Sequence, residues 1–131
     1  MSGQEFSIDR KIYYHHTDAG GVVYYADYLK MLEEARTEFC LQRGLDCAEW
    51  FKKGIAFVVV HCGIDYLKAA QYADTVAVTA KIKKLGNSSI HFEQEIVRQN
   101  TVLVKASVVW ACVSRDFKTQ TLPGRIRALL T

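Results

Sequence analysis

Residues 27–44, DYLKMLEEARTEFCLQRG, decide how the rest of this sequence is read, because their pattern is helical. Apolar side chains recur in this stretch at spacings of three and four residues, which is the period of an amphipathic helix. The recurring positions are Tyr28, Leu32, Ala35 and Phe39. Asp27 has the residue type of an N-cap, and Gly44 has the type that commonly follows a helix end. The sequence therefore predicts a long helix over residues 27–43.

Outside this helix the chain is rich in β-branched residues, arranged in alternating or continuous apolar runs that are typical of strands. One strand is predicted before the helix and four after it. The predicted strands cover residues 6–14, 55–62, 74–85, 90–97 and 102–113. Short turns, GNSS and RQNT, separate the last three strands and indicate an antiparallel meander. Pro123 begins a tail that is predicted to form a terminal helical turn.

The predicted fold is an α+β domain in which one helix lies on a curved five-stranded antiparallel sheet. A chain of 131 residues suits a single domain over residues 1–131. One helix cannot cover both faces and both edges of such a sheet, and an uncovered edge invites pairing with a second subunit. We therefore expect a homo-oligomer.

Charge and composition exclude several classes of partner. Lys and Arg number 17 and Asp and Glu number 14, and the resulting net charge of +3 is too small to indicate a nucleic-acid interface. The apolar runs are too short to span a membrane, and MSGQEFSIDRK at the N-terminus lacks the apolar core of a signal peptide. The four cysteines form no C-x-x-C pair, so we expect a reduced, cytoplasmic protein.

The loop before the helix, HHTDAGGVVY at residues 15–24, allows three interpretations. A metal site would use His15, His16 and Asp18, but neighbouring histidines on a strand point to opposite faces, so we expect no metal. An ordinary turn would use Asp18 to accept backbone N–H groups, and composition alone favours this reading. A catalytic loop would deliver Asp18 to the helix N-terminus, where unpaired N–H groups stabilise negative charge. A carboxylate there can attack a carbonyl or activate water.

A family resemblance favours the catalytic interpretation. The stretch YYHHTDAGGVVYYADYLKMLEEARTEF, residues 13–39, resembles the signature of hotdog-fold acyl-CoA thioesterases. The similar branches are the 4-hydroxybenzoyl-CoA thioesterase family and the Tol–Pal-associated acyl-CoA thioesterases. Tyr14, TDAGGVVY and EARTE are the specific features. GIAFVVVHCGIDYLKAAQYAD at 54–74 and LPGRIRALL at 122–130 extend the resemblance over nearly the whole chain.

The resemblance implies a hotdog fold, dimers or tetramers with active sites at subunit interfaces, and hydrolysis of an acyl-CoA thioester. Asp18 would be the nucleophile or general base, and the backbone N–H of Tyr25 would hold the oxyanion. Tyr14 would position the substrate or Asp18. CoA would be part of the substrate, and no separate cofactor is implied. At position 25 the Tol–Pal branch usually has His, and at position 70 this chain has Ala where Pro is expected.

Two other functions remain open at this point: a hotdog hydratase or dehydratase, and a non-catalytic acyl-thioester-binding or scaffold protein. The first usually needs a His with a second carboxylate, for which no motif is visible. Glu33 and Arg36 are spaced to pair on the helix, and His16 is expected to be structural. The phosphates of CoA need cations, for which the candidates are Lys83, Lys84, Arg98, Arg115 and Lys118.

Overall fold

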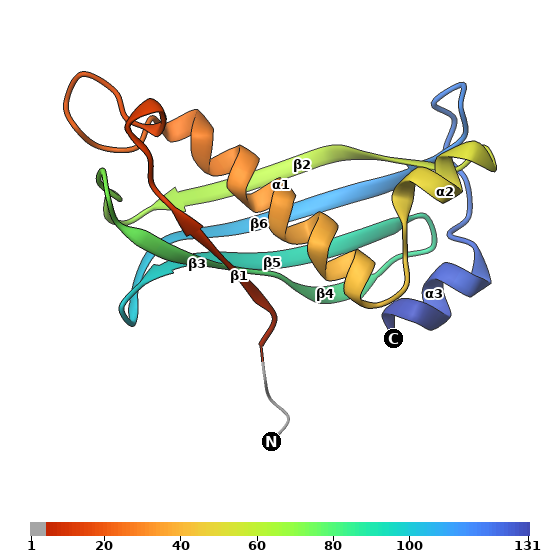
Figure 1. The fold of residues 1–131 in the computed structure, drawn as a ribbon. Coiled ribbons are helices and arrows are strands. Elements are labelled where there is room, and N and C mark those ends of the chain that lie inside the picture. The colour runs from red at the N-terminus through yellow and green to blue at the C-terminus, as the bar shows by residue number, and fades with distance from the viewer. Residues whose placement is uncertain (1–4) are drawn as a thin grey trace.

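The computed structural model describes residues 5–131 and confirms the α+β fold with one long helix against one face of an antiparallel sheet (Figure 1). The strands are β1 (Ser7–Lys11), β2 (Ala56–Tyr66), β3 (Thr75–Thr79), β4 (Lys81–Leu85), β5 (Ser89–Arg98) and β6 (Thr101–Val113). The helices are α1 (Tyr25–Gln42), α2 (Cys47–Lys52) and α3 (Gly124–Leu130), with a 3-10 turn at Tyr14–His16. The strand order is β1-β3-β5-β6-β2, and β4 pairs with β5 beside this path.

The sheet has six strands where five were predicted. The expected strand over 74–85 is divided at Ala80 into β3, which pairs with β1 and β5, and β4, which pairs with β5 alone. The alternation of Val76, Val78 and Ala80 continues through the break, and all three are buried. The apolar pattern therefore predicted the buried face correctly but could not show the change of strand partner.

Helix α1 begins earlier than expected. Its first residue is Tyr25 and its N-cap is Tyr24, so the prediction that Asp27 caps the helix is wrong. Asp27 lies in the first turn instead, where a carboxylate still favours the positive end of the helix. The predicted helix end is confirmed, because Gly44 follows it with φ of 89° and donates its N–H to Leu41.

Two further local elements differ from the predictions. The strand predicted over 6–14 ends at Lys11, and Tyr14 lies in the 3-10 turn that follows. The short helix α2 was missed, although Asp46 caps it by accepting the N–H of Ala48 at 3.0 Å.

The core lies between α1 and the sheet. Alternate residues of β5 face the helix, and Ile90, Phe92 and Ile96 are fully buried there. Phe92 contacts Phe39 of α1 and Trp110 of β6, with ring centroids 6.1 and 4.9 Å apart. Burial of each such side chain contributes about 1.5–3 kcal/mol. This packing fixes the axis of α1, and therefore the position of its N-terminus.

Strand β2 forms one edge of the sheet. It pairs with β6 on one side, and within residues 5–131 no strand pairs with its other side. Its register with β6 shifts between Val59 and His61, and the side chain of Val60 is 60% exposed. In this same part of the chain, no helix is long and apolar enough to cross a membrane.

Candidate active site

The loop that carries Asp18 is a tight, hydrogen-bonded hairpin. Thr17 and Val23 form an isolated antiparallel bridge, and the N–H of Asp18 donates to Val22 at 2.9 Å. The N–H of Gly21 donates to the carbonyl of Asp18 at 3.0 Å, with Gly21 at φ of 81°. That conformation favours glycine, which explains one of the paired glycines in the motif.

The carboxylate of Asp18 lies at the exposed tip of this hairpin. Its Oδ1 accepts the N–H of Gly20 at 2.7 Å, as expected of an Asp that shapes its own turn. No other hydrogen bond reaches this carboxylate from the described residues. The turn interpretation is therefore correct for the backbone, and it leaves the second carboxylate oxygen available to a substrate or water.

The N-terminus of α1 follows directly from this hairpin. The N–H of Tyr24 donates to the carbonyl of His16 at 2.8 Å, which ties the start of the helix to the turn before Asp18. Tyr24 makes no side-chain cap, and the N–H groups of Tyr25 and Ala26 have no acceptor within residues 5–131. These two groups carry the partial positive charge of the helix end.

The two predicted tyrosines differ in their surroundings. The ring of Tyr25 is 60% exposed and lies against those of Tyr24 and Tyr66, at centroid distances of 4.9 and 6.4 Å. Tyr14 is more exposed still, and its ring meets Tyr72 edge to face at 5.8 Å. The hairpin joins Asp18 to the N-terminus at Tyr25, whereas the phenol of Tyr14 makes no hydrogen bond within the described chain.

The histidines before Asp18 are arranged differently from the prediction. They lie in the 3-10 turn, so their rings are 4.1 Å apart and do not point to opposite faces of a strand. His16 is buried, and its Nδ1 accepts the N–H of Tyr13 at 2.8 Å. Burial, and then the charge of His15, lower the pKa of His16. Across residues 5–131 no three His, Cys, Asp or Glu residues gather as metal ligands would.

One neighbour of the candidate site was not expected from the sequence. Tyr28, identified only as an apolar helix position, places its hydroxyl 2.9 Å from the N–H of Ala70 and its ring 5.7 Å from Tyr66. Burial raises the pKa of Tyr28. The tyrosine run in the sequence was the available signal, but the contact with residue 70 was not visible in it.

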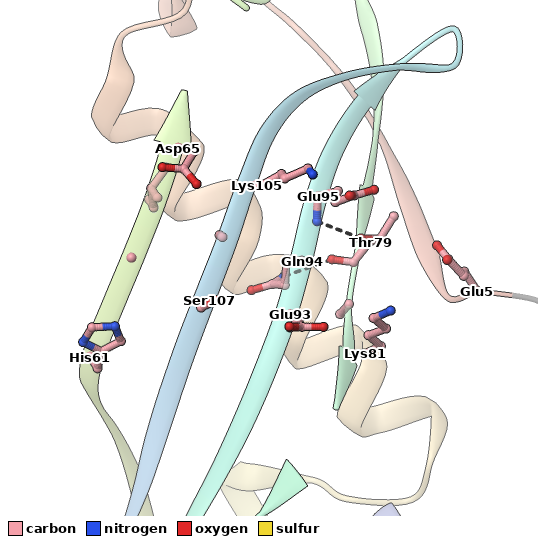
Figure 2. Close-up of a pocket in the computed structure, with 14 residues that line it drawn as sticks. Glu5, His61, Asp65, Thr79, Lys81, Glu93, Gln94, Glu95, Lys105 and Ser107 are labelled. Carbon is pink, nitrogen blue, oxygen red and sulfur yellow. Dashed lines mark hydrogen bonds between the residues drawn. The ribbon is translucent and has the colours of Figure 1, made fainter. Parts of the chain in front are cut away.

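A large hollow on the sheet does not belong to this site. It has a volume of about 660 Å³ and is lined by polar residues of β2, β4, β5 and β6, among them Asp65, Lys105 and Glu95. Figure 2 shows these side chains across the strands, with α1 behind. Asp18, Tyr14 and Tyr25 do not line this hollow. The hollow and the helix N-terminus are therefore separate parts of the surface.

Most of the candidate cations for CoA have partners within the chain. Lys83 lies 3.7 Å from Glu93, and Arg115 donates to the carbonyl of Lys52 at 2.6 Å. Arg98 forms an ion pair with Asp74 at 2.7 Å. The predicted pairing of Glu33 with Arg36 is wrong, because Glu33 accepts from Thr37 and Arg36 turns into the core.

Known proteins that resemble this chain match most of its length. The thioesterase superfamily matches residues 20–105. The acyl-CoA thioesterase YbgC of Haemophilus influenzae is 38% identical over 132 residues, covering 98% of this chain and 96% of that protein. A probable thioesterase from Bartonella henselae is 29% identical with a TM-score of 0.85, over 92% of this chain and 100% of that one.

A hypothetical protein from Aquifex aeolicus has the same fold, with a TM-score of 0.91 at 24% identity over 96% of this chain and 99% of that one. Family and fold thus agree with the resemblance that the hairpin and helix motif indicated. The chain therefore belongs to the thioesterase superfamily, as a thioester hydrolase with the hotdog fold.

Proposed function

We propose that this protein hydrolyses acyl-CoA thioesters to a free acid and CoA, with Asp18 as the catalytic carboxylate and the N–H of Tyr25 as the oxyanion donor. The observation that carries the proposal is the hairpin, which holds an exposed carboxylate and leads directly into a helix whose first two N–H groups have no acceptor among residues 5–131. The naming of relatives such as YbgC as acyl-CoA thioesterases supports the choice of substrate.

The proposed reaction begins when the thioester carbonyl oxygen accepts the N–H of Tyr25. As a nucleophile, Asp18 attacks the carbonyl carbon, the C–S bond breaks and CoA leaves as a thiolate. Water then hydrolyses the mixed anhydride and restores the carboxylate. As a general base, Asp18 instead takes a proton from the attacking water, and the proton passes to the thiolate.

Both routes build negative charge on the same oxygen, and one preorganised N–H donor is worth roughly 3–4 kcal/mol in other hydrolases. Thiolate is a good leaving group and needs little acid assistance. Tyr is therefore compatible with the proposed chemistry at position 25, where one branch of the family has His. We further propose that Tyr14 positions the substrate, because its ring stands exposed beside Tyr72 at the edge of this site. CoA enters as part of the substrate, and the mechanism uses no separate cofactor.

The chain is proposed to work as a homodimer or homotetramer in the cytoplasm. Four free cysteines favour a reducing compartment. The unpaired edge of β2 exposes apolar side chains, Val59 and Val60 among them, and such an edge is a template for pairing with a second copy.

The test is thiol release, followed with a thiol-reactive dye on short-chain, long-chain and aromatic acyl-CoAs. Wild type is compared with Asp18→Asn, and with Asp9→Asn as a matched control at an exposed Asp of β1. We expect release by wild type and Asp9→Asn, and a loss of about a hundredfold or more in Asp18→Asn.

Equal rates in wild type and Asp18→Asn would remove this carboxylate from the chemistry. Loss of substrate without thiol release would indicate a hydratase or dehydratase. Binding of acyl-CoA without turnover would indicate the scaffold function.

A further inference from the structure

The connection between β2 and β3, residues 67–74, lies beside the Asp18 hairpin and the first turn of α1 (Figure 1). We name this segment the connector. Gln71 in the connector forms an isolated antiparallel bridge with Val22 of the hairpin. The rings of Tyr72 and Tyr14 are in contact across the same boundary. The connector therefore packs against the hairpin.

Ala70 of the connector holds the chain on both sides of Tyr25. Its carbonyl accepts the N–H of Val23 at 2.9 Å, and its own N–H donates to the hydroxyl of Tyr28 at 2.9 Å. Ala70 is fully buried, so water could not replace either hydrogen bond. Loss of one would leave a buried N–H or carbonyl group unsatisfied. Val23 precedes the helix N-terminus and Tyr28 follows it. Both backbone groups of one residue thus fix the position of the Tyr25 N–H.

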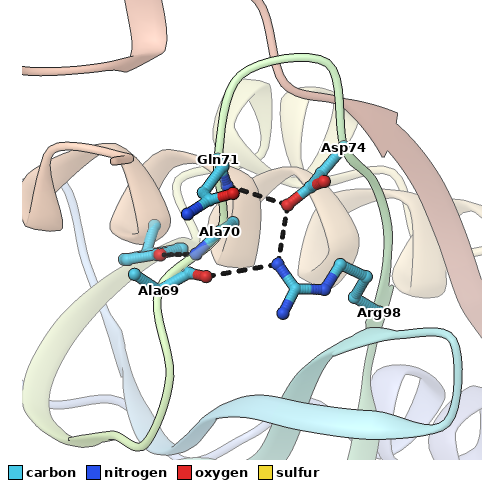
Figure 3. Close-up of polar contacts among 6 residues, drawn as sticks. Ala69, Ala70, Gln71, Asp74 and Arg98 are labelled. Atoms are coloured by element: carbon cyan, nitrogen blue, oxygen red, sulfur yellow. Dashed lines mark hydrogen bonds and ion pairs between the residues drawn. The ribbon is translucent and has the colours of Figure 1, made fainter. Parts of the chain in front are cut away.

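Arg98, at the end of β5, holds the connector at two points (Figure 3). Its Nη1 lies 2.7 Å from Oδ2 of Asp74 and 3.3 Å from the carbonyl of Ala69, the residue before Ala70. The same Oδ2 of Asp74 accepts the N–H of Gln71 at 2.8 Å. The guanidinium therefore binds the connector on either side of Ala70 and Gln71.

The ion pair is more sheltered than an ordinary surface pair. The side chains of Arg98 and Asp74 are 28% and 23% exposed. Burial acts to raise the pKa of Asp74, but the Gln71 N–H and the Arg98 guanidinium outweigh it and lower that pKa. The hydrogen bond from the Gln71 N–H couples the ion pair to the connector backbone.

We propose that Arg98 and Asp74 are positioning residues for the active site: their ion pair holds the connector against Val23 and Tyr28, and thereby sets the Tyr25 N–H relative to Asp18. This inference rests on the proposed function. A displacement of about 1 Å in a catalytic group can cost on the order of a hundredfold in rate, so loosening the connector lowers kcat. KM changes little, because Arg98 binds Asp74 and the carbonyl of Ala69 and is given no contact with the substrate in this mechanism.

The experiment compares Arg98→Gln, Arg98→Lys and Asp74→Asn with a matched control, Arg127→Gln. Arg127 of α3 also ties down a turn, since it donates to the carbonyl of Gly86 at 2.7 Å, but at the opposite end of the molecule (Figure 1). For each protein, kcat and KM are measured on the acyl-CoA that wild type hydrolyses fastest, together with Tm. Hydrogen exchange of the Val23 and Ala70 amides is followed by NMR.

We expect Arg98→Gln and Asp74→Asn to lower kcat by about tenfold or more, with KM within about twofold, and to speed exchange at both amides. Arg98→Lys restores part of kcat, because its ammonium keeps the positive charge near Asp74 but lies on a differently shaped side chain that does not place a nitrogen where Nη1 meets both acceptors. We expect Arg127→Gln to lower Tm while kcat and the exchange of both amides stay as in wild type. The proposal is overturned if Arg98→Gln and Arg127→Gln have the same kcat, or if exchange at Val23 and Ala70 does not change.

Tyr28→Phe provides a second route if the Arg98 variants fold poorly. It removes the acceptor of the Ala70 N–H while keeping the ring and the ion pair. We expect it to reproduce the loss in kcat, and to be less than additive with Arg98→Lys because both act on one segment. Full additivity would contradict a shared role.

Failure of the proposed function gives a different pattern. If wild type releases no thiol from any acyl-CoA, the thioesterase proposal fails. Faster exchange in Arg98→Gln would then still show that the ion pair positions the helix N-terminus. Asp18→Asn should abolish turnover while leaving exchange at Ala70 as in wild type, which separates chemistry from positioning.

Discussion

The guanidinium of Arg36 donates to the side-chain oxygen of Gln94 at 2.9 Å, in the centre of the contact between α1 and the sheet. Both side chains are buried, with Arg36 only 5% exposed, and among residues 5–131 no carboxylate lies in ion-pair range of this cation. The amide of Gln94 also donates to the carbonyls of Leu32 and Thr79, at 2.9 and 3.1 Å. Burial lowers the pKa of Arg36.

This arrangement predicts a larger loss of stability for one substitution than for its counterpart. Gln94→Leu removes the acceptor and leaves a buried charge unpaired, which should cost about 3 kcal/mol or more of unfolding free energy. Arg36→Met removes the charge and leaves both donor bonds of Gln94 in place, but it leaves Oε1 of Gln94 without a donor, so it should cost about 1–2 kcal/mol, less than Gln94→Leu. Urea unfolding measures both. A loss in Arg36→Met as large as in Gln94→Leu would show that the cation itself stabilises the fold.

The contact between Arg36 and Gln94 is one that the sequence alone could not predict. Spacing on the helix suggested that Arg36 pairs with Glu33, because neighbours three residues apart share a face. The actual partner lies 58 residues away, on a strand whose register no local pattern specifies. Helix and strand positions were predicted well because their apolar periods are local. The division of the strand at Ala80 was not, since it depends on which strands pair with it.

In the candidate site, too, some residues follow from a local motif and others from tertiary contacts. Asp18 and Tyr25 are close in sequence, and the family motif brings a hairpin and a helix start together in one stretch. The resemblance could therefore point to both residues as candidates, and their roles stay a prediction. Arg98 was considered only as a candidate for the phosphates of CoA, because its contact with the connector arises from tertiary folding.

The role of the Tyr25 backbone can be tested with proline. Position 25 is the first residue of α1, where Pro is well tolerated, and Tyr24 already has the extended conformation that a following Pro requires, with φ of −62° and ψ of 129°. Tyr25→Pro therefore keeps the helix but removes the N–H. We expect kcat to fall by about a hundredfold or more.

Tyr25→Phe is the matched control for the side chain. It keeps the N–H and the ring contact with Tyr66, so kcat should remain within about threefold of wild type. Circular dichroism verifies the helix in both variants. Full activity in Tyr25→Pro would rule out this N–H as the oxyanion donor, and a large loss in Tyr25→Phe would assign the chemistry to the phenol.

His16 should make stability depend on pH near neutrality. Its pKa is lowered from 6.5 by burial first, and the neutral ring is needed for Nδ1 to accept the N–H of Tyr13. The unfolded chain binds the proton more readily, so stability is complete above about pH 6.5 and is lost as pH falls toward the folded pKa. Asn can place an oxygen near the position of Nδ1 without titrating.

We therefore expect Tm of wild type to fall between pH 7.5 and pH 5 by more than that of His16→Asn, measured by thermal unfolding in buffers of matched ionic strength. Asp74 has a lowered pKa, so its contribution is present above the unfolded value and is lost only in more acidic solution. The contributions of His16 and Asp74 to stability are therefore lost in different pH ranges. Parallel Tm curves for wild type and His16→Asn would contradict the role given to His16.

Gly21 and Gly54 form a matched pair for the hairpin. Both have positive φ, 81° and 91°, and a Cβ at either would meet no atom within 4 Å. Substitution by Ala thus imposes the same backbone strain at each, about 1–2 kcal/mol. Only Gly21 supports Asp18, through its N–H to the Asp18 carbonyl. We expect Gly21→Ala and Gly54→Ala to lose similar unfolding free energy, and only Gly21→Ala to lose kcat beyond about tenfold. Equal activity would mean that the hairpin tolerates distortion.

We expect two copies of the chain to meet along the edge of β2. Val60 is 60% exposed at the register shift, and a charge placed on an edge strand opposes pairing with another strand. Val60→Lys should therefore shift the protein toward monomer in sedimentation equilibrium. Leu41→Lys is the control, because Leu41 is an exposed apolar residue of helix α1 and lies on no strand. If the active site is completed between subunits, thiol release should fall with the fraction of oligomer. An unchanged oligomer in Val60→Lys would place the subunit contact elsewhere, and a fully active monomer would show that one chain holds the whole site.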